Sequence, residues 1–353
     1  MDQRCEELKG WLEQVLPEFA GFNAADWQLQ PVSGDASFRR YFRALSGGKT
    51  WIAVDAPTDK EDSRPFIQVA QSLEAHGVPV PHIFTYDLEL GFMLLGDFGD
   101  DLYLQHLNSE TVDPLYKSAL DTLLLIQGCP SDPARPLPLY DLPLLQREMA
   151  LFRDWFLVEL LGMSLSPDAN QLLDLLFDHL IDSALEQPLV FVHRDYHSRN
   201  LMCRNQELPG VIDFQDAVEG PVTYDLVSLL RDCYVAWPDE QVYTWVENYR
   251  LALIERGQRM PDGHHFRRWF DLMGAQRHLK AIGIFARLNI RDGKPGYLGD
   301  IPRTLNYLIS VTAKTEELKP VAGWLVAEVL PVMRQHPCFA EDVLDHWVVS
   351  CEQ

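Results

Sequence analysis

The segment that most constrains the fold is residues 189–216, LVFVHRDYHSRNLMCRNQELPGVIDFQD. Its apolar start predicts a strand at 189–192, and a polar loop follows from His193. Two more strands, at 201–203 and 211–214, flank a short turn and predict a β-hairpin directly after the loop. The segment therefore places a polar loop between a buried strand and a hairpin.

Pairing of the two hairpin strands would bring oxygen-bearing side chains together. If Cys203 faces Gly210 across the turn, then Asn200 lies opposite Asp213, and residues paired in this way have Cβ atoms roughly 5 Å apart. An amide oxygen and a carboxylate are ligands of the kind that hold Mg²⁺ on nucleotide phosphates. Asp195, in the loop before the hairpin, can accept a hydrogen bond from a substrate hydroxyl. We therefore predict Asn200 and Asp213 as metal ligands and Asp195 as the catalytic residue.

The order H-R-D-x-x-x-x-N, followed by an Asp after the next strand, is similar to the catalytic arrangement of eukaryotic-type protein kinases. HRDYHSRN and then VIDFQDAVEGPVTYDL, without D-F-G, resemble the aminoglycoside phosphotransferase and choline kinase superfamily. A chance His-x-Asp beside an ordinary hairpin would not explain the whole ordered set. The resemblance implies an α+β, two-lobed protein-kinase-like fold, with a small N-terminal antiparallel-sheet lobe (1–97) that binds nucleotide and a larger, mainly helical C-terminal lobe (98–353). It also implies ATP and Mg²⁺, and a structural role for His193 and Asp225 in supporting the catalytic loop.

The N-terminal lobe carries helix and strand patterns. Helices are predicted at 2–19 and 65–76, and strands at 27–32, 38–45, 50–55 and 91–95. The turn after the first strand has the position of the kinase turn whose backbone N–H groups approach the phosphates, although a plain hairpin turn is an alternative. By resemblance, the backbone near the end of the last strand would bind adenine. The predicted nucleotide-binding residues are Ser33, Gly34, Asp35, Ala36, Ser37, Met93 and Leu95.

The third strand departs from the superfamily where a phosphate-binding lysine is expected. In WIAVDAP, Asp55 stands at or next to that place, and a carboxylate cannot pair with phosphate oxygens. The usual acidic partner would lie on the next helix, where Glu74 is too near the end, so both halves of the ion pair are absent. The preceding strand offers Arg39, Arg40 and Arg43, of which we predict Arg43 at the phosphates; solvated edge-strand arginines are the alternative.

Composition narrows the class of protein. The net charge of −22 argues against a nucleic-acid partner, whose phosphates need a basic face, but not against ATP. Hydrophobic residues make up 47% of the chain, enough for two cores, and the six cysteines are scattered like free thiols of a reducing cytosol. No signal peptide or apolar run of the ~20 residues that span a bilayer is present. We expect a cytoplasmic protein with no nucleic-acid or membrane partner; the sequence predicts no particular protein partner.

Longer segments of the sequence narrow the range of possible acceptor substrates. Helices are predicted in the C-terminal lobe at 114–126, 144–161, 167–185, 239–257 and 266–288. DASFRRYFR, WIAVDAP, HRDYHSRNLM and residues 276–303 resemble the bacterial anomeric sugar kinases of cell-wall recycling. That resemblance implies transfer of the γ-phosphate of ATP to the C1 hydroxyl of N-acetylmuramate and N-acetylglucosamine. Candidate substrate residues are His197, Arg199 and Arg277, and for the lactyl carboxylate of the muramate also Arg287 and Arg291, in an order that the sequence leaves open.

Two alternatives remain at this point. One is a kinase for another small hydroxyl compound, such as an aminoglycoside, choline or a homoserine-like metabolite, and an acidic chain suits polycations. The other is a non-catalytic binding module with a kinase fold, which the missing lysine suggests.

Overall fold

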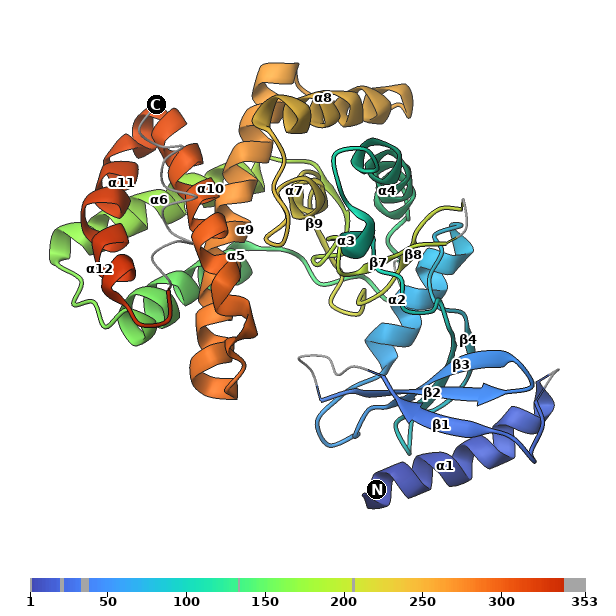
Figure 1. Ribbon diagram of the computed structural model, residues 1–353. Coiled ribbons are helices and arrows are strands. Elements are labelled where there is room, and N and C mark those ends of the chain that lie inside the picture. Colours follow the sequence, from blue (N-terminus) through green and yellow to red (C-terminus); the bar gives the residue numbers. More distant parts are fainter. Residues whose placement is uncertain (1, 20–21, 33–37, 133, 205–206, 340–353) are drawn as a thin grey trace. The chain divides into compact units, whose positions relative to one another are not determined.

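The computed structural model describes residues 2–19, 22–32, 38–132, 134–204 and 207–339 of the 353-residue chain (Figure 1). The chain forms two compact units: Met1–Cys129 with Arg199–Ala217, and Pro130–Ser198 with Val218–Gln353. The hairpin after the catalytic loop therefore belongs to the first unit, and the loop up to Ser198 belongs to the second. These units reflect packing within the chain; the lobe boundary predicted after residue 97 stays a prediction.

The first unit is built on an antiparallel sheet of five strands in the order β1-β2-β3-β5-β4. Its strands are β1 (Gln28–Pro31), β2 (Arg40–Ser46), β3 (Lys49–Asp55), β4 (Ile83–Asp87) and β5 (Phe92–Gly96). Its helices are α1 (Gln3–Val15), α2 (Arg64–Ala75), α3 (Tyr103–His106) and α4 (Val112–Gln127), and the two short strands of the hairpin are β7 (Leu201–Met202) and β8 (Gly210–Val211). The predicted antiparallel sheet is confirmed, and β4 is an additional edge strand that the sequence analysis did not identify.

Helix α1 covers one face of this sheet (Figure 1). Asp2 caps the helix by accepting a hydrogen bond from the backbone N–H of Cys5 at 2.9 Å. The apolar residues recur at helical spacing, so they form one stripe that faces the strands. The resulting core contains residues of the helix, of the segment directly after it and of the sheet: Leu8, Trp11, Leu12, Leu16, Ala44, Trp51, Ala53, Phe92 and Leu94. Each fully buried leucine contributes about 1.5–3 kcal/mol, and this packing holds β2 and β3 in place.

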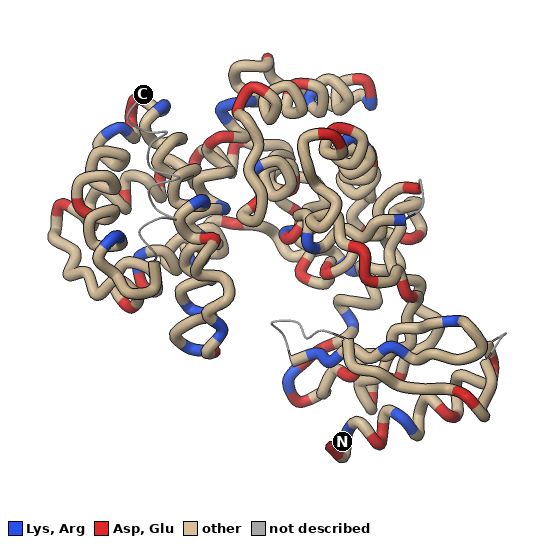
Figure 2. The backbone as a smooth tube through the Cα atoms, in the orientation of Figure 1, with Lys and Arg blue, Asp and Glu red and all other residues tan. Residues whose placement is uncertain are grey.

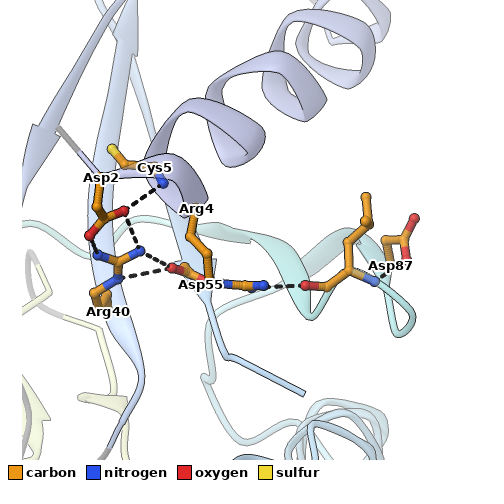
Figure 3. A network of polar contacts seen from close by, with 7 residues as sticks. Asp2, Arg4, Cys5, Arg40, Asp55 and Asp87 are labelled. Carbon is orange, nitrogen blue, oxygen red and sulfur yellow. Dashed lines mark hydrogen bonds and ion pairs between the residues drawn. The ribbon is translucent and has the colours of Figure 1, made fainter. Parts of the chain in front are cut away.

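Asp55 at the end of β3 is a buried carboxylate held by two arginines (Figure 3). Its side chain has no exposed surface, and Nε of Arg4 and Nε of Arg40 each donate to it at 2.9 Å. Arg40 also pairs with Asp2, and Arg4 donates to the carbonyl of Leu90 at 2.9 Å. Asp55 thus joins α1 to the sheet, which explains why a carboxylate stands where a lysine was expected.

We expect Asp55→Asn to lower the free energy of unfolding by about 2–3 kcal/mol, because an amide at this buried site offers only one acceptor oxygen to two charged, partly exposed donors. Urea denaturation would measure the change. Asp62→Asn is a matched control, because the pair between Asp62 and Arg64 is exposed and worth less than about 1 kcal/mol. Equal effects of the two variants would contradict this account of Asp55.

The second unit is mainly helical. Its helices are α5 (Leu142–Leu151), which continues as a π-helix (Phe152–Leu160), α6 (Pro167–Leu185), α7 (Tyr224–Leu230), α8 (Asp239–Glu255), α9 (Gly263–Asp292), α10 (Ile301–Lys314), α11 (Lys319–Trp324) and α12 (Leu330–Gln335), with a π-helical segment (Leu325–Val329) before the last. Short 3₁₀ segments lie at Leu16–Glu18 in the first unit and at Pro295–Asp300 and Glu316–Leu318 here. Strands β6 (Leu189–Val192) and β9 (Val218–Pro221) pair antiparallel. The predicted helical C-terminal part is confirmed.

Helix α9 is the central element of the second unit (Figure 1). Asp262 caps its N-terminus by accepting from the backbone N–H of His265, and the chain leaves it at Gly293, where φ is 65°. A Cβ at Gly283 would lie 2.3 Å from the carbonyl carbon of Leu151, so only glycine lets α9 approach α5 this closely. That approach brings buried charged residues of the two helices together.

Three features bear on the predictions for the whole chain. Among the described residues, no helix combines the length and the apolar character that crossing a bilayer requires. The cysteines of this part, Cys5, Cys129, Cys203, Cys233 and Cys338, are free thiols. Figure 2 shows acidic and basic stretches interspersed along both units.

Candidate active site

A buried carboxylate braces the start of the catalytic loop. β6 has the bounds that the sequence predicts, and after it the backbone N–H groups of His193 and Arg194 donate to the two oxygens of Asp225 at 2.6 and 3.0 Å. Arg194 has φ of 75°, a conformation that a non-glycine residue adopts only when its surroundings hold it. Burial raises the pKa of Asp225 to about 7, although both N–H donors oppose that rise. We therefore propose that Asp225 supports the loop, together with the fully buried His193.

A second group of buried charges fixes the side chain of Arg194. Arg194 pairs with Glu148 of α5, and Nζ of Lys280 lies 3.3 Å from the same carboxylate. Tyr140 donates its hydroxyl to Glu148 and accepts a hydrogen bond from Gln276 at 2.9 Å. Burial would raise the pKa of Glu148, but Lys280 and Arg194 outweigh it, so the pKa is lowered and the carboxylate stays ionised. The sequence analysis identified neither Glu148 nor Lys280.

Cations surround Asp195, the predicted catalytic residue. Burial would raise the pKa of Asp195, but the nearby charges of Lys280, His197 and Arg277 lower it to about 2. The carboxylate is therefore ionised throughout the physiological pH range and is a weak base. Such a group can accept a hydrogen bond and orient a hydroxyl, which matches the predicted role.

The charge of Lys280 leads to a prediction about pH. In the wild type, protonation of Asp195 lies near pH 2, so turnover should not lose this carboxylate between about pH 5 and pH 8. In Lys280→Met, burial acts without its main opposing charge, so the pKa of Asp195 rises and turnover falls as the pH is lowered. The pH profile of kcat/KM measures this, with Lys280→Arg as the charge-conserving control. Identical acid limbs for wild type and Lys280→Met would contradict the electrostatic account.

Asn200 and Asp213 meet in the first unit, but not by the pairing that the sequence predicted. Nδ2 of Asn200 lies 3.3 Å from Oδ2 of Asp213. The hairpin register is shifted by one residue, because Leu201 pairs with Val211 and Met202 with Gly210. The prediction that Asn200 lies directly opposite Asp213 is therefore wrong.

The backbone after β8 shows how Asn200 and Asp213 meet despite the shifted register. Strand β8 ends at Val211, and Asp213 has φ of 66°, so it lies in an irregular segment rather than in the strand predicted to reach residue 214. That conformation, rather than cross-strand pairing, turns its carboxylate toward Asn200. A Cβ at Gly210 would lie 2.5 Å from the ring of Phe98, so glycine is required for this ring to pack on the hairpin.

The oxygen groups at Asp213 fit a divalent cation. Nε2 of Gln215 donates to Oδ1 of Asp213 at 2.7 Å, and Oε1 of Gln215 is buried without a hydrogen-bond partner among the described residues. One carboxylate and one amide oxygen leave most coordination positions for phosphate oxygens and water, which is how Mg²⁺ binds beside nucleotides. With the amide of Asn200 rotated, its oxygen and the carboxylate of Asp213 would be the protein ligands.

Arg43, the predicted phosphate-binding residue, is held by carboxylates. Nε of Arg43 donates to Asp97 at 2.6 Å, and Nη1 donates to Asp100 at 2.7 Å. These two acids already balance its charge, so the geometry gives no support to a role at the phosphates, which stays a prediction.

A different arginine has the acidic partner that the sequence analysis did not find. Nη2 of Arg39 lies 3.1 Å from Glu61, and both side chains are largely buried. Glu61 precedes α2, whereas Glu74 on that helix bonds to His82 at 2.7 Å. An Arg–Glu pair is therefore present near the sheet, between residues for which the sequence predicted no pairing.

Five of the other predicted nucleotide-binding residues lie in one short segment. Ser33, Gly34, Asp35, Ala36 and Ser37 lie outside the described residues.

Met93 and Leu95 are buried in β5, which has β3 on one edge and β4 on the other. The sheet therefore engages the backbone of these two residues. A backbone contact with adenine is therefore more compatible with the segment that follows β5 than with Met93 or Leu95.

The predicted substrate residues are divided between the two units. His197 and Arg277 belong to the second unit, where both contribute to the field at Asp195. The ring of His197 contacts Tyr234, with centroids 5.3 Å apart. Arg199 is the first residue of the returning segment of the first unit.

Comparison with known protein families shows which family this chain belongs to. The model described as "Phosphotransferase enzyme family" matches residues 28–270. The chain belongs to this family. Members of a phosphotransferase family are enzymes, so the alternative of a non-catalytic binding module is not supported.

The sequences of relatives align with this phosphotransferase along almost the whole chain. An N-acetylmuramate/N-acetylglucosamine kinase of Pseudomonas aeruginosa is 47% identical over 92% of this chain and 97% of its own. A kinase of the same name from Neisseria meningitidis is 41% identical over 92% of this chain and 96% of its own.

Comparison with solved structures bears on the fold. A choline kinase from Cryptosporidium parvum has a TM-score of 0.61 at 14% identity, covering 91% of this chain and 99% of its own. The predicted two-lobed protein-kinase-like fold of aminoglycoside phosphotransferases and choline kinases is thus confirmed.

Proposed function

We propose that this phosphotransferase transfers the γ-phosphate of ATP to the C1 hydroxyl of N-acetylmuramate and N-acetylglucosamine, as part of peptidoglycan recycling. The observation that carries the proposal is the 47% identity with a kinase named for these two sugars, which extends over 333 residues. Identity at this level over both units includes the parts that would select the acceptor as well as the catalytic loop.

Asp195 is the residue that binds and orients the acceptor hydroxyl. Phosphoryl transfer depends mainly on positioning and on stabilising charge. Asp195 accepts a hydrogen bond from the C1 hydroxyl, fixes the direction of its lone pair toward the γ-phosphorus, and takes up the proton as the new O–P bond forms. In the same step the bond between the γ-phosphorus and the bridging β–γ oxygen breaks, and ADP leaves with that electron pair. An anomeric hydroxyl is more acidic than other sugar hydroxyls, so a carboxylate whose pKa is about 2 is sufficient.

Asn200 and Asp213 are the proposed ligands of Mg²⁺. A bound Mg²⁺ would neutralise charge on the β- and γ-phosphates. The side chain of Gln215 holds Oδ1 of Asp213, which leaves Oδ2 directed toward Asn200. The two ligands are therefore oriented before the nucleotide arrives.

The setting follows from the substrates. ATP and recovered cell-wall sugars meet in the cytoplasm, so we place the protein there. We expect no nucleic-acid or membrane partner; a protein partner is not predicted.

A panel of acceptors tests the proposal. The purified chain is incubated with MgATP and, separately, N-acetylmuramate, N-acetylglucosamine, glucose, choline, an aminoglycoside and homoserine, and ADP release is measured. We expect turnover with the two N-acetylated sugars well above that with the others. Turnover confined to choline, the aminoglycoside or homoserine would overturn the proposal in favour of another small-molecule kinase.

A further inference from the structure

Arg277 is a buried cation with little to balance its charge directly. Only 6% of its surface is exposed, and its Nη1 donates to the thiol of Cys233 at 3.7 Å, a weak hydrogen bond. Its Nε is buried without a hydrogen-bond partner within the described ranges. A buried charge without a close counterion is costly, and that cost falls when a ligand supplies an anion.

Within the part of the chain that the structure describes, no carboxylate forms an ion pair with Arg277. Asp232 accepts hydrogen bonds from the backbone N–H of Ser198 at 3.0 Å and from its hydroxyl at 2.5 Å, and another from the backbone N–H of Tyr234 at 3.0 Å. Asp195 lies within electrostatic range, since the charge of Arg277 helps to lower the pKa of Asp195. Arg277 is therefore close to the group that would orient the acceptor, while the neighbouring acid is already engaged.

Lys280 lies one turn further along α9 and has a different environment. Its Nζ lies 3.3 Å from Glu148 and donates to the hydroxyl of Tyr224 at 3.0 Å. Lys280 therefore has a direct ion pair, with a carboxylate that it shares with Arg194. Of the two α9 cations that act on Asp195, Arg277 is the one left with a donor to offer.

The other candidates on α9 are less suitable. Arg287 lies ten residues further along, about 15 Å at the rise of an α-helix, and Arg291 about 21 Å further. The side chain of Arg291 is 56% exposed, and its Nε donates to Asp292 at 2.8 Å. Arg277, by contrast, is among the charges that lower the pKa of Asp195 most.

We propose that Arg277 binds the lactyl carboxylate of N-acetylmuramate and thereby sets the preference between the two sugars, an inference that rests on the proposed function. The two acceptors differ only in that N-acetylmuramate carries a carboxylate-bearing ether on O3. A guanidinium can bind a carboxylate through two parallel hydrogen bonds, and a partly desolvated pair of this kind is strong. In a chain with a net charge of −22, an anionic acceptor needs such a local cation.

The experiment compares both sugars in the same variants. The variants are Arg277→Met, which removes the charge, and Arg277→Lys, which keeps the charge but not the paired donors. Steady-state kinetics at about pH 8 keep Asp195 ionised in every variant. For Arg277→Met we expect kcat/KM for N-acetylmuramate to fall about 10- to 100-fold more than for N-acetylglucosamine, with most of the difference in KM. Arg277→Lys should fall between Arg277→Met and the wild type.

Two controls separate this role from a structural one. Activity on N-acetylglucosamine reports in the same sample that the variant is folded, and Arg291→Met tests an exposed arginine of the same helix. An equal loss on both sugars, an unchanged ratio of kcat/KM, or a change of that ratio in Arg291→Met instead would overturn the inference.

Calorimetric titration of the full chain with each sugar, in the absence of ATP, measures the effect of the same contact on affinity without any turnover. Weaker binding of N-acetylmuramate alone in Arg277→Met supports the inference even if the wild type phosphorylates neither sugar, a result that would refute only the proposed function. Equal binding of N-acetylmuramate to the wild type and to Arg277→Met overturns it.

Discussion

Asp195→Asn is expected to lower kcat by about 100- to 10,000-fold, the range attributed to a positioned proton acceptor. The amide has nearly the same size as the carboxylate, so the loop should keep its conformation. It cannot take up the proton of the acceptor hydroxyl, and it presents an N–H₂ group where a charged acceptor stood. Single-turnover kinetics with N-acetylglucosamine would measure the loss in the chemical step.

The affinity for ATP distinguishes this role from a general disturbance. Asp195 is not among the proposed metal ligands, so the dissociation constant of MgATP should stay close to the wild-type value in Asp195→Asn. Asp292→Asn, an exposed site on α9, serves as the matched control and should behave as the wild type in both measurements. Substantial turnover by Asp195→Asn would exclude the assigned role.

Asp213→Asn is expected to lower kcat by about 100-fold or more and to raise the Mg²⁺ concentration that turnover requires, because a neutral ligand replaces an anionic one. Asparagine tolerates positive φ better than most residues, so the backbone at 66° should survive the substitution. A titration of turnover against Mg²⁺ at fixed ATP would measure both effects.

Asn200→Asp provides the complementary variant. It retains an oxygen ligand but places a second carboxylate where the amide nitrogen of Asn200 now lies, 3.3 Å from Oδ2 of Asp213. Two carboxylates this close repel each other unless a cation lies between them. We expect Asn200→Asp to keep measurable turnover and to be stabilised by Mg²⁺ more than the wild type in thermal unfolding. A Mg²⁺ requirement that neither variant alters would show that these residues are not the ligands.

The hairpin illustrates what a sequence pattern can and cannot predict. Residue spacing predicted that Asn200 and Asp213 come together, and they do. The predicted register was wrong by one residue, and the predicted strand was too long because apolar residues continue at Ile212 and Phe214 after β8 has ended. A residue at positive φ has no signal in hydrophobic periodicity, so the bend at Asp213 could not be foreseen.

The charges that support Asp195 were harder to find. Residues 272–280 of α9 are buried on all sides, so no apolar stripe shows which polar side chains face the loop. Lys280 and its partner Glu148 are 132 positions apart in sequence, and only the packing of α5 against α9 brings them together. The available signal was the run Gln276, Arg277, His278 and Lys280, which places polar residues among the apolar ones in the middle of the helix.

The sequence shows an aspartate at or next to the place where the strand lysine was expected, and the role of that aspartate became clear only from the structure. Asp55 stands at the end of β3, but its partners Arg40 and Arg4 come from 15 and 51 positions away. Their arrangement depends on how α1 lies on the sheet, which local propensity does not determine. For the same reason, the pair between Arg39 and Glu61 was not foreseen.

The position of the phosphate on the product tests the central claim most directly. After reaction of N-acetylglucosamine with MgATP, ³¹P–¹³C coupling in NMR spectra identifies the phosphorylated carbon, and the 1-deoxy analogue is assayed in parallel. The account predicts phosphorus coupled to C1 and no turnover of the 1-deoxy analogue. Phosphate on another carbon, or turnover of the 1-deoxy analogue, would contradict it.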